Sequence, residues 1–151
     1  MGDPFSILNI SATGLTAERL RMDVISDNIA NVNTTRTPEG GPYIRKLVLF
    51  SEIRKEQEDD FISVFEKIRS DELEGGVKVV GIIKDQKTPL KRVYDPNHPD
   101  AGPDGYVRYP NINVVSEMVD MISASRAYEA NLQVVSNFRN MAIRAIDILK
   151  G

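Results

Sequence analysis

Residues 111–151 read NINVVSEMVDMISASRAYEANLQVVSNFRNMAIRAIDILKG, and this stretch decides the fold. No proline interrupts it, and its only glycine is the last residue. Apolar side chains recur mostly three or four positions apart, at Val115, Met118, Val119, Ile122, Leu132, Val135, Phe138, Ala142, Ile146 and Leu149. This spacing is typical of one side of an α-helix. The spacing shifts around residues 125–128, which indicates a bend or a change of partner.

A helix over residues 114–149 would be roughly 54 Å long. That length exceeds the core of a compact domain of this size, so the apolar stripe needs a partner in this chain or in another. The N-terminal residues offer one, because they predict a second long helix over residues 5–32, roughly 40 Å long. Its apolar positions are Leu8, Ala12, Leu15, Met22, Ile25, Ile29 and Val32.

Local signals mark the two ends of this N-terminal helix. Asp3 and Pro4 are typical of an N-cap and a first helical position. Gly14 lies inside the helix, where glycine costs about 1 kcal/mol relative to alanine. Asparagine and threonine at residues 31–35 predict the end of the helix, because asparagine tolerates the left-handed conformation and threonine favours extended backbone.

The middle of the chain predicts a small β-rich region. Short β-branched runs indicate strands at residues 43–50, 77–83, 91–94 and 105–109, with a possible bulge at Gly81. Between them, residues 52–74 contain nine acidic and four basic side chains. We interpret this segment as a solvated excursion with one short helix at about residues 61–68, or as a mobile loop.

The predicted fold class is therefore α+β. Long N- and C-terminal helices pack as a coiled-coil-like pair, with a small β-rich middle region and an acidic insertion. The expected division is an N-terminal helical segment (1–36), the middle region (37–110, with the charged insertion at 52–74) and the C-terminal long helix (111–151).

Composition argues against several classes of function. The chain has 151 residues, a net charge of −3, no cysteine and one histidine. A basic patch for nucleic acid, a thiolate metal site and an apolar membrane span are all missing from the sequence. The N-terminus also lacks the basic and apolar regions of a cleavable secretory signal. We expect no nucleic-acid binding, no direct membrane insertion, no cofactor and no enzymatic activity.

One loop resembles a metal or catalytic site. Asp95, His98, Asp100 and Asp104 lie close together in a turn-dense, proline-rich stretch. Their spacing does not match a calcium-binding loop, which places a glycine at the sixth position. We favour an interpretation in which the aspartates cap turns. An enzyme using this loop remains an alternative, and it would require metal binding and loss of function in a His98→Ala variant.

Several motifs resemble the bacterial flagellar axial proteins, the family of rod, hook and hook-associated proteins. Near the N-terminus these are GLTA at residues 14–17 and NIANVNTT at 28–35. More specific motifs, similar to proximal rod members of that family, are VYDPNHPDA at 93–101, GYV at 105–107, YPNI at 109–112, EMVDMI at 117–122 and RAYEAN at 126–131. The resemblance covers roughly residues 5–50 and 75–150. Residues 52–74 are longer and more acidic than is usual in the family.

The resemblance implies a structural subunit of the proximal rod, which self-assembles through its terminal helices into a torque-transmitting drive shaft. Implied partners are copies of itself, other proximal and distal rod proteins, the rod–ring adaptor, the membrane ring base and the flagellar type III export apparatus. The implied location is the rod of the basal body in the periplasmic space, after export without signal cleavage. The alternative is a soluble helical adaptor or export-associated binding protein, which would be a well-folded monomer with a discrete partner.

The helix patterns and these motifs together indicate which residues serve assembly and packing. Buried asparagines in helix interfaces can fix register at a cost in stability. The expected positions are Leu15, Met22, Ile25, Asn28, Ile29, Asn31, Asn33, Thr34, Pro110, Asn111, Met118, Met121, Ile122, Tyr128, Asn131, Leu132 and Val135.

Overall fold

The computed structural model describes residues 4–53 and 75–150. Its elements, in chain order, are α1 (Pro4–Ala30), β1 (Lys46–Glu52), β2 (Val77–Lys84), β3 (Lys91–Tyr94), β4 (Tyr106–Tyr109) and α3 (Val114–Lys150). The predicted α+β class, with long helices at both ends and small sheets between them, is confirmed. The N-cap expected at Asp3 and the short helix expected near 61–68 lie outside the described residues.

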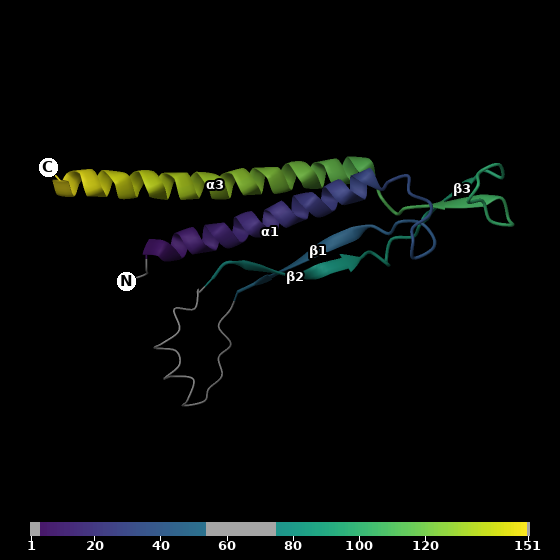
Figure 1. Ribbon diagram of the computed structural model, residues 1–151, viewed down its shortest axis with the longest axis horizontal. Helices are drawn as coiled ribbons and strands as arrows, with labels where there is room; N and C mark the ends of the chain where they lie inside the picture. The colour runs from purple at the N-terminus through teal and green to yellow at the C-terminus, as the bar shows by residue number, and fades with distance from the viewer. Residues whose placement is uncertain (1–3, 54–74, 151) are drawn as a thin grey trace, which may run out of the picture.

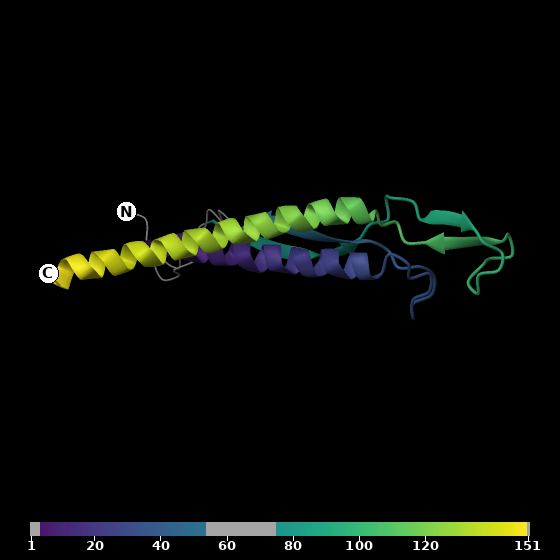
Figure 2. The same cartoon turned by 90° about the horizontal axis from the view of Figure 1, so that it is seen from above.

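The two helices lie side by side and run antiparallel (Figure 1). Three contacts establish this direction: Asn28 bonds to Glu117, Arg21 pairs with Asp120, and Gly14 lies against Asn131. The predicted coiled-coil-like pair is thus confirmed. Because α3 has 37 residues and α1 only 27, the C-terminal end of α3 extends beyond the start of α1, as both views show (Figures 1 and 2).

Two separate antiparallel hairpins form the middle region. In the first, β1 pairs with β2, and the register shifts where Leu49 faces Gly81 but Phe50 faces Val79. Val80 is therefore the extra residue of a bulge, next to the glycine where a bulge was expected. This hairpin lies along α1, whereas β3 and β4 form the second hairpin at the far end of the molecule (Figure 1).

The end of α1 differs from the prediction in one respect. The helix stops at Ala30, and the chain leaves it through a turn in which Val32 N donates to Ile29 O at 3.3 Å. Among the described residues, only glycines have a positive φ. The helix therefore ends through tighter i→i−3 turns rather than through a residue in the left-handed conformation.

The hydrophobic core is small. Its buried members are Ala17, Val24, Ile25, Tyr43, Val107, Ile112 and Ala124. Within the described part of α3, Ala124 is the one apolar side chain that is fully buried. The other apolar side chains of α3 whose burial is described are thus partly or largely exposed, although a typical soluble helix buries its apolar stripe.

Candidate assembly interface

A seam of α3 side chains faces α1. Its members recur alternately four and three positions apart, as in a heptad pattern, and are less exposed than most of their neighbours. They are Glu117, Met121, Ala124, Tyr128, Asn131, Val135 and Phe138. Because the spacing averages 3.5 residues, the seam stays in contact with α1 along its length rather than winding around the helix.

The helices approach each other closely at Gly14. A Cβ atom added to this glycine would lie 2.9 Å from Nδ2 of Asn131. The same Nδ2 donates to the Ala127 carbonyl at 3.0 Å, which holds the Asn131 amide in place. The low helix propensity of Gly14 is therefore offset by an approach that a larger side chain would hinder.

A buried polar junction fixes the other end of the pair. Asn28 is 1% exposed. Its Nδ2 donates to the Lys46 carbonyl at 2.9 Å and to Oε2 of Glu117 at 3.1 Å, while its Oδ1 accepts from the Lys46 amide at 2.9 Å. This single side chain therefore joins α1, β1 and α3. Such fully bonded amides stabilise one register over others, since any shift leaves buried polar atoms unpaired.

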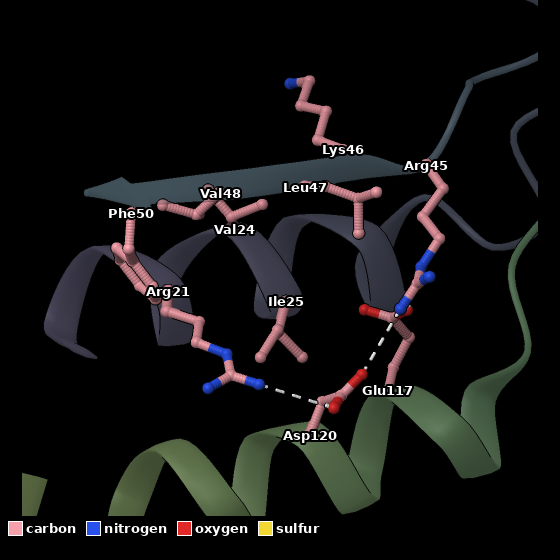
Figure 3. Close-up of a pocket in the computed structure, with 10 residues that line it drawn as sticks. All are labelled: Arg21, Val24, Ile25, Arg45, Lys46, Leu47, Val48, Phe50, Glu117 and Asp120. Carbon is pink, nitrogen blue, oxygen red and sulfur yellow. Dashed lines mark hydrogen bonds and ion pairs between the residues drawn. The ribbon is translucent and has the colours of Figure 1, made fainter. Parts of the chain in front are cut away.

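Charged pairs surround the junction (Figure 3). Glu117 is 1% exposed and accepts from Nε of Arg45 at 2.5 Å. Arg45 also reaches Asp120 at 3.3 Å, and Arg21 of α1 approaches Asp120 at 3.6 Å. The hollow that these side chains line, between α1, β1 and α3, is thus walled by ion pairs that hold the three elements together.

A second amide connects the junction to the middle region. Asn111 lies just before α3 and is 5% exposed. Its Oδ1 accepts from the Arg45 amide at 2.9 Å, and its Nδ2 donates to the carbonyls of Asp85 and Thr88 at 2.9 and 3.0 Å. The start of α3, the start of β1 and the loop after β2 are therefore held together by one side chain.

The electrostatics of the junction favour charged Asp27 and neutral Tyr43. A hydrogen bond from Lys46, at 2.8 Å between Nζ and Oδ2, is the main cause that lowers the pKa of Asp27. Burial raises the pKa of Tyr43 above its usual range, and the hydrogen bond between its hydroxyl and Asp27, at 3.0 Å, adds to the effect.

The start of the predicted stripe lies on the other side of α3. Val115, Met118, Val119 and Ile122 are 70, 56, 61 and 55% exposed. At 3.6 residues per turn they lie about half a turn away from the seam. We call these four residues the outer patch. The predicted stripe is therefore divided between two sides of α3. The shift at residues 125–128 is where its apolar side chains move from the outer patch to the seam.

The C-terminal part of α3 is also uncovered. Since Gly14 lies opposite Asn131, antiparallel pairing places the start of α1 opposite about residue 141. All described side chains from residue 141 to 149 are exposed. We call residues 141–150 the overhang. Its large apolar side chains are Met141, Ile143, Ile146, Ile148 and Leu149.

The residues expected to serve assembly and packing fall into three groups. Four are buried at the junction and the core next to it: Ile25, Asn28, Pro110 and Asn111. Nine are half-buried: Leu15, Met22, Ile29, Asn31, Thr34, Met121, Tyr128, Asn131 and Val135. Four are exposed: Asn33, Met118, Ile122 and Leu132. The structure brings together the first group and most of the second. The members of the third group point at least partly toward solvent.

Sequence reasoning missed Glu117 and Arg45, which carry the ion pair of the junction. A charged residue among apolar neighbours at a helix start looks like a surface residue. The heptad spacing was the available signal. Counting back from Tyr128 in alternate steps of four and three residues gives Ala124, Met121 and then Glu117, which places Glu117 in the seam.

The polar side chains of the Asp95–Asp104 loop make hydrogen bonds within turns and ion pairs. Oδ1 of Asp95 accepts from the Asn97 amide at 3.2 Å, and Asp104 pairs with Arg92 at 2.7 Å. Nδ1 of His98 accepts from a backbone amide at 3.1 Å. Among residues 4–53 and 75–150, no three metal-ligating side chains gather closely enough to hold an ion. Neither described helix has the length and hydropathy that a membrane span requires.

Comparison with known proteins gives matches at both ends of the chain. Residues 8–36 match the family model "Flagella basal body rod protein", and residues 104–148 match "Flagellar basal body rod FlgEFG protein C-terminal". These two matches contain most of α1 and α3 and the residues of the seam. The matches to both terminal helices thus place the chain in the class of flagellar rod proteins.

Three relatives narrow the assignment. The chain is 50% identical to the flagellar basal-body rod protein FlgC of Borreliella burgdorferi, over 97% of this chain and 98% of the relative. It is 40% identical to that of Bacillus subtilis, with the same coverage, and 36% identical to that of Salmonella typhimurium, over 95% and 96%. The chain therefore belongs to the FlgC family of flagellar basal-body rod proteins.

Proposed function

We propose that this protein is a structural subunit of the proximal rod, in which its terminal helices associate with neighbouring subunits to build a torque-transmitting shaft. One observation carries the proposal. The outer patch and the overhang together leave at least nine large apolar side chains of α3 exposed. Groups of exposed apolar side chains of this kind mark interaction sites. When neighbouring subunits meet through two different surfaces and the contacts do not close into a ring, each added subunit covers this apolar surface on the one before it. The result is a filament.

The buried junction supports the mechanical part of the proposal. Asn28 and Glu117 connect the helix pair to β1, and Asn111 connects both to the loop after β2. Packed polar networks of this kind hold elements in a single arrangement. A load applied to the helices is therefore passed to the middle region through bonded side chains rather than through a hinge.

The proposal extends to partners and location. The protein assembles with other flagellar rod components in the basal body. Beyond that, we infer contacts with copies of itself, with neighbouring proximal and distal rod proteins, with the rod–ring adaptor and with the membrane ring base. We also infer export through the flagellar type III apparatus and assembly in the periplasmic space. The soluble-adaptor alternative is not favoured, because the relatives are rod proteins over nearly their whole length.

Cell fractionation tests the proposed function. A tagged protein, expressed at native level in a strain lacking its own copy, should restore motility and should co-purify with detergent-extracted basal bodies. A tagged cytosolic protein serves as the control for carry-over. Recovery of the functional protein in the cytosol, with none in basal bodies, would contradict the proposal.

A further inference from the structure

The hairpin formed by β3 and β4 is set apart from the other elements. Among the described helices and strands, these two strands contact only each other. The hairpin projects from the end of the helix pair (Figures 1 and 2), and all four residues of β3 are exposed. Its orientation therefore depends on the loops that connect it to the rest of the chain.

The loop between β3 and β4, residues 95–105, is tied to the segment that follows α1. Oδ2 of Asp100 accepts from the Thr35 hydroxyl at 2.7 Å, and Oδ1 of Asp100 lies 3.8 Å from Nη1 of Arg36. The Asp100 side chain is 24% exposed, so this contact is partly shielded from water. We call the bond between Thr35 and Asp100 the clasp. It joins residues 65 positions apart and holds the hairpin to the end of α1.

His98 fixes the backbone of Asp100, because its Nδ1 accepts from the Asp100 amide at 3.1 Å. Other side chains make the same bond to the amide two residues on, and these are Asp85, Asp95, Asp104 and Asn113. Their oxygens remain acceptors between about pH 5 and 8, whereas a charged histidine donates from both ring nitrogens. His98, the single histidine of the chain, is thus the one acceptor of this set that mild acid removes.

Protonation also gives His98 a competing partner. The charged or titratable groups around it are Asp95 and Asp100 of its own loop, Arg36 of the segment after α1, and Tyr109 of β4, whose ring centroid lies 6.3 Å away. A charged imidazole attracts the Asp100 carboxylate that the clasp uses and repels Arg36. Its Nδ1–H would also face the Asp100 amide, which places two donors together. Both effects weaken the clasp.

We propose that His98 is a pH-sensitive switch for the clasp. Neutral His98 keeps the 95–105 loop bound to the segment after α1, and charged His98 releases it. Release alters the orientation of the β3–β4 hairpin and leaves the helix pair in place, because no atom of the Asn28–Glu117 junction belongs to the clasp. The inference concerns the shape of one subunit and does not depend on the proposed function.

Spin labels on the full chain test the switch, since the chain has no cysteine of its own. The label pair is Asp23→Cys on α1 and Asn97→Cys on the loop, both at exposed positions. Pulsed electron paramagnetic resonance should give one narrow distance distribution at about pH 8 and gain a second, longer distance at about pH 5.5. Circular dichroism at both pH values checks that the helices stay folded.

Variants in the labelled background separate the switch from other effects of pH. His98→Asn keeps an acceptor that does not change charge, so its distribution should be narrow at both pH values. Thr35→Val and Asp100→Ala remove the clasp and should show the longer distance at both. Thr16→Val removes an exposed hydroxyl of α1 and should behave like the unmodified chain.

Three results would overturn the inference. The first is an unmodified chain with the same distribution at both pH values. The second is a His98→Asn chain that responds to pH as the unmodified chain does. The third is a narrow distribution at about pH 8 in both variants that lack the clasp.

Discussion

The side-chain amide of Asn28 donates to the carboxylate of Glu117 at 3.1 Å, and 89 positions of sequence separate the two residues. Both side chains are 1% exposed. The bond joins the end of α1 to the start of α3, and through Arg45 and Lys46 it also holds β1. It defines the register in which the two terminal helices meet.

Glu117→Ala should destabilise the protein by about 2 kcal/mol, because it removes a charged acceptor shared by Asn28 and Arg45 at a buried site. Asn28 then keeps its bonds to Lys46, and Arg45 keeps its pair with Asp120. Glu117→Gln, which keeps a hydrogen-bonding group of the same size, should cost less. Urea unfolding measures both values. Glu129→Ala, at an exposed position of the same helix, is the matched control and should change the free energy of unfolding by less than about 0.5 kcal/mol. Equal losses in Glu117→Ala and in the control would refute the role of the junction.

Gly14 and Asn131 should show energetic coupling. Alanine at position 14 gains up to about 1 kcal/mol of helix propensity, but its Cβ meets the Asn131 amide at 2.9 Å. Gly14→Ala should therefore be neutral or destabilising in the unmodified chain and stabilising in an Asn131→Ala background. A double-mutant cycle should give a coupling of at least about 0.5 kcal/mol. Additive effects would show that the close approach has no energetic consequence.

The contribution of Asp27 should disappear in acid. Its hydrogen bond from Lys46 lowers its pKa, so the folded state binds this proton less readily than the unfolded state. The stabilisation is present above the unfolded pKa of about 3.9 and is lost as pH falls through the lower folded pKa. Asp27→Asn should thus lower Tm at pH 7 and have little effect near pH 2. Asp23→Asn, at an exposed position of α1, serves as the control. A Tm difference that is the same at both pH values would contradict this account.

Leu132→Asp should block rod assembly while leaving the middle region folded. Leu132 lies on α3 beside the seam and is 44% exposed, so a carboxylate there is tolerated by the monomer but not by a covered interface. Swimming assays and basal-body recovery measure the effect. Ser136→Asp adds the same charge at an exposed polar position of the same helix and should remain motile. Normal motility of the Leu132→Asp strain would argue against this part of α3 as an interface.

Hydrogen exchange along α3 should follow the burial of its side chains. In dilute monomer, amides of residues 141–150 should exchange quickly, because none of the described elements covers them, whereas amides of residues 117–131 should be protected by α1 and the junction. This gradient is expected of a subunit whose terminal helices complete their folding on assembly. Full protection of the C-terminal amides in the monomer would exclude that behaviour.

Much of the fold was predictable because its signals are local. Proline-free apolar periodicity predicted both helices to within a few residues, and β-branched runs predicted the four strands. The starts of β1 and β4, the ends of β1 and β2 and the end of α1 differed by one to three residues, since hydrogen bonds to other elements decide them. The candidate interface was predicted less well. Asn28, Asn111 and Asn131 were identified, but Glu117 and Arg45 were not, because their importance depends on partners distant in sequence.

The sequence by itself determined that this chain has two long amphipathic helices around a small β-rich region, and its motifs pointed to a flagellar axial protein. Only the tertiary structure decided which side of α3 meets α1. Helical periodicity could not choose, because α3 carries apolar side chains on two opposite sides. The choice depends on long-range contacts: the Asn28–Glu117 bond at one end, and at the other the space that Gly14 leaves for Asn131. Those contacts turn the seam inward and leave the outer patch and the overhang exposed.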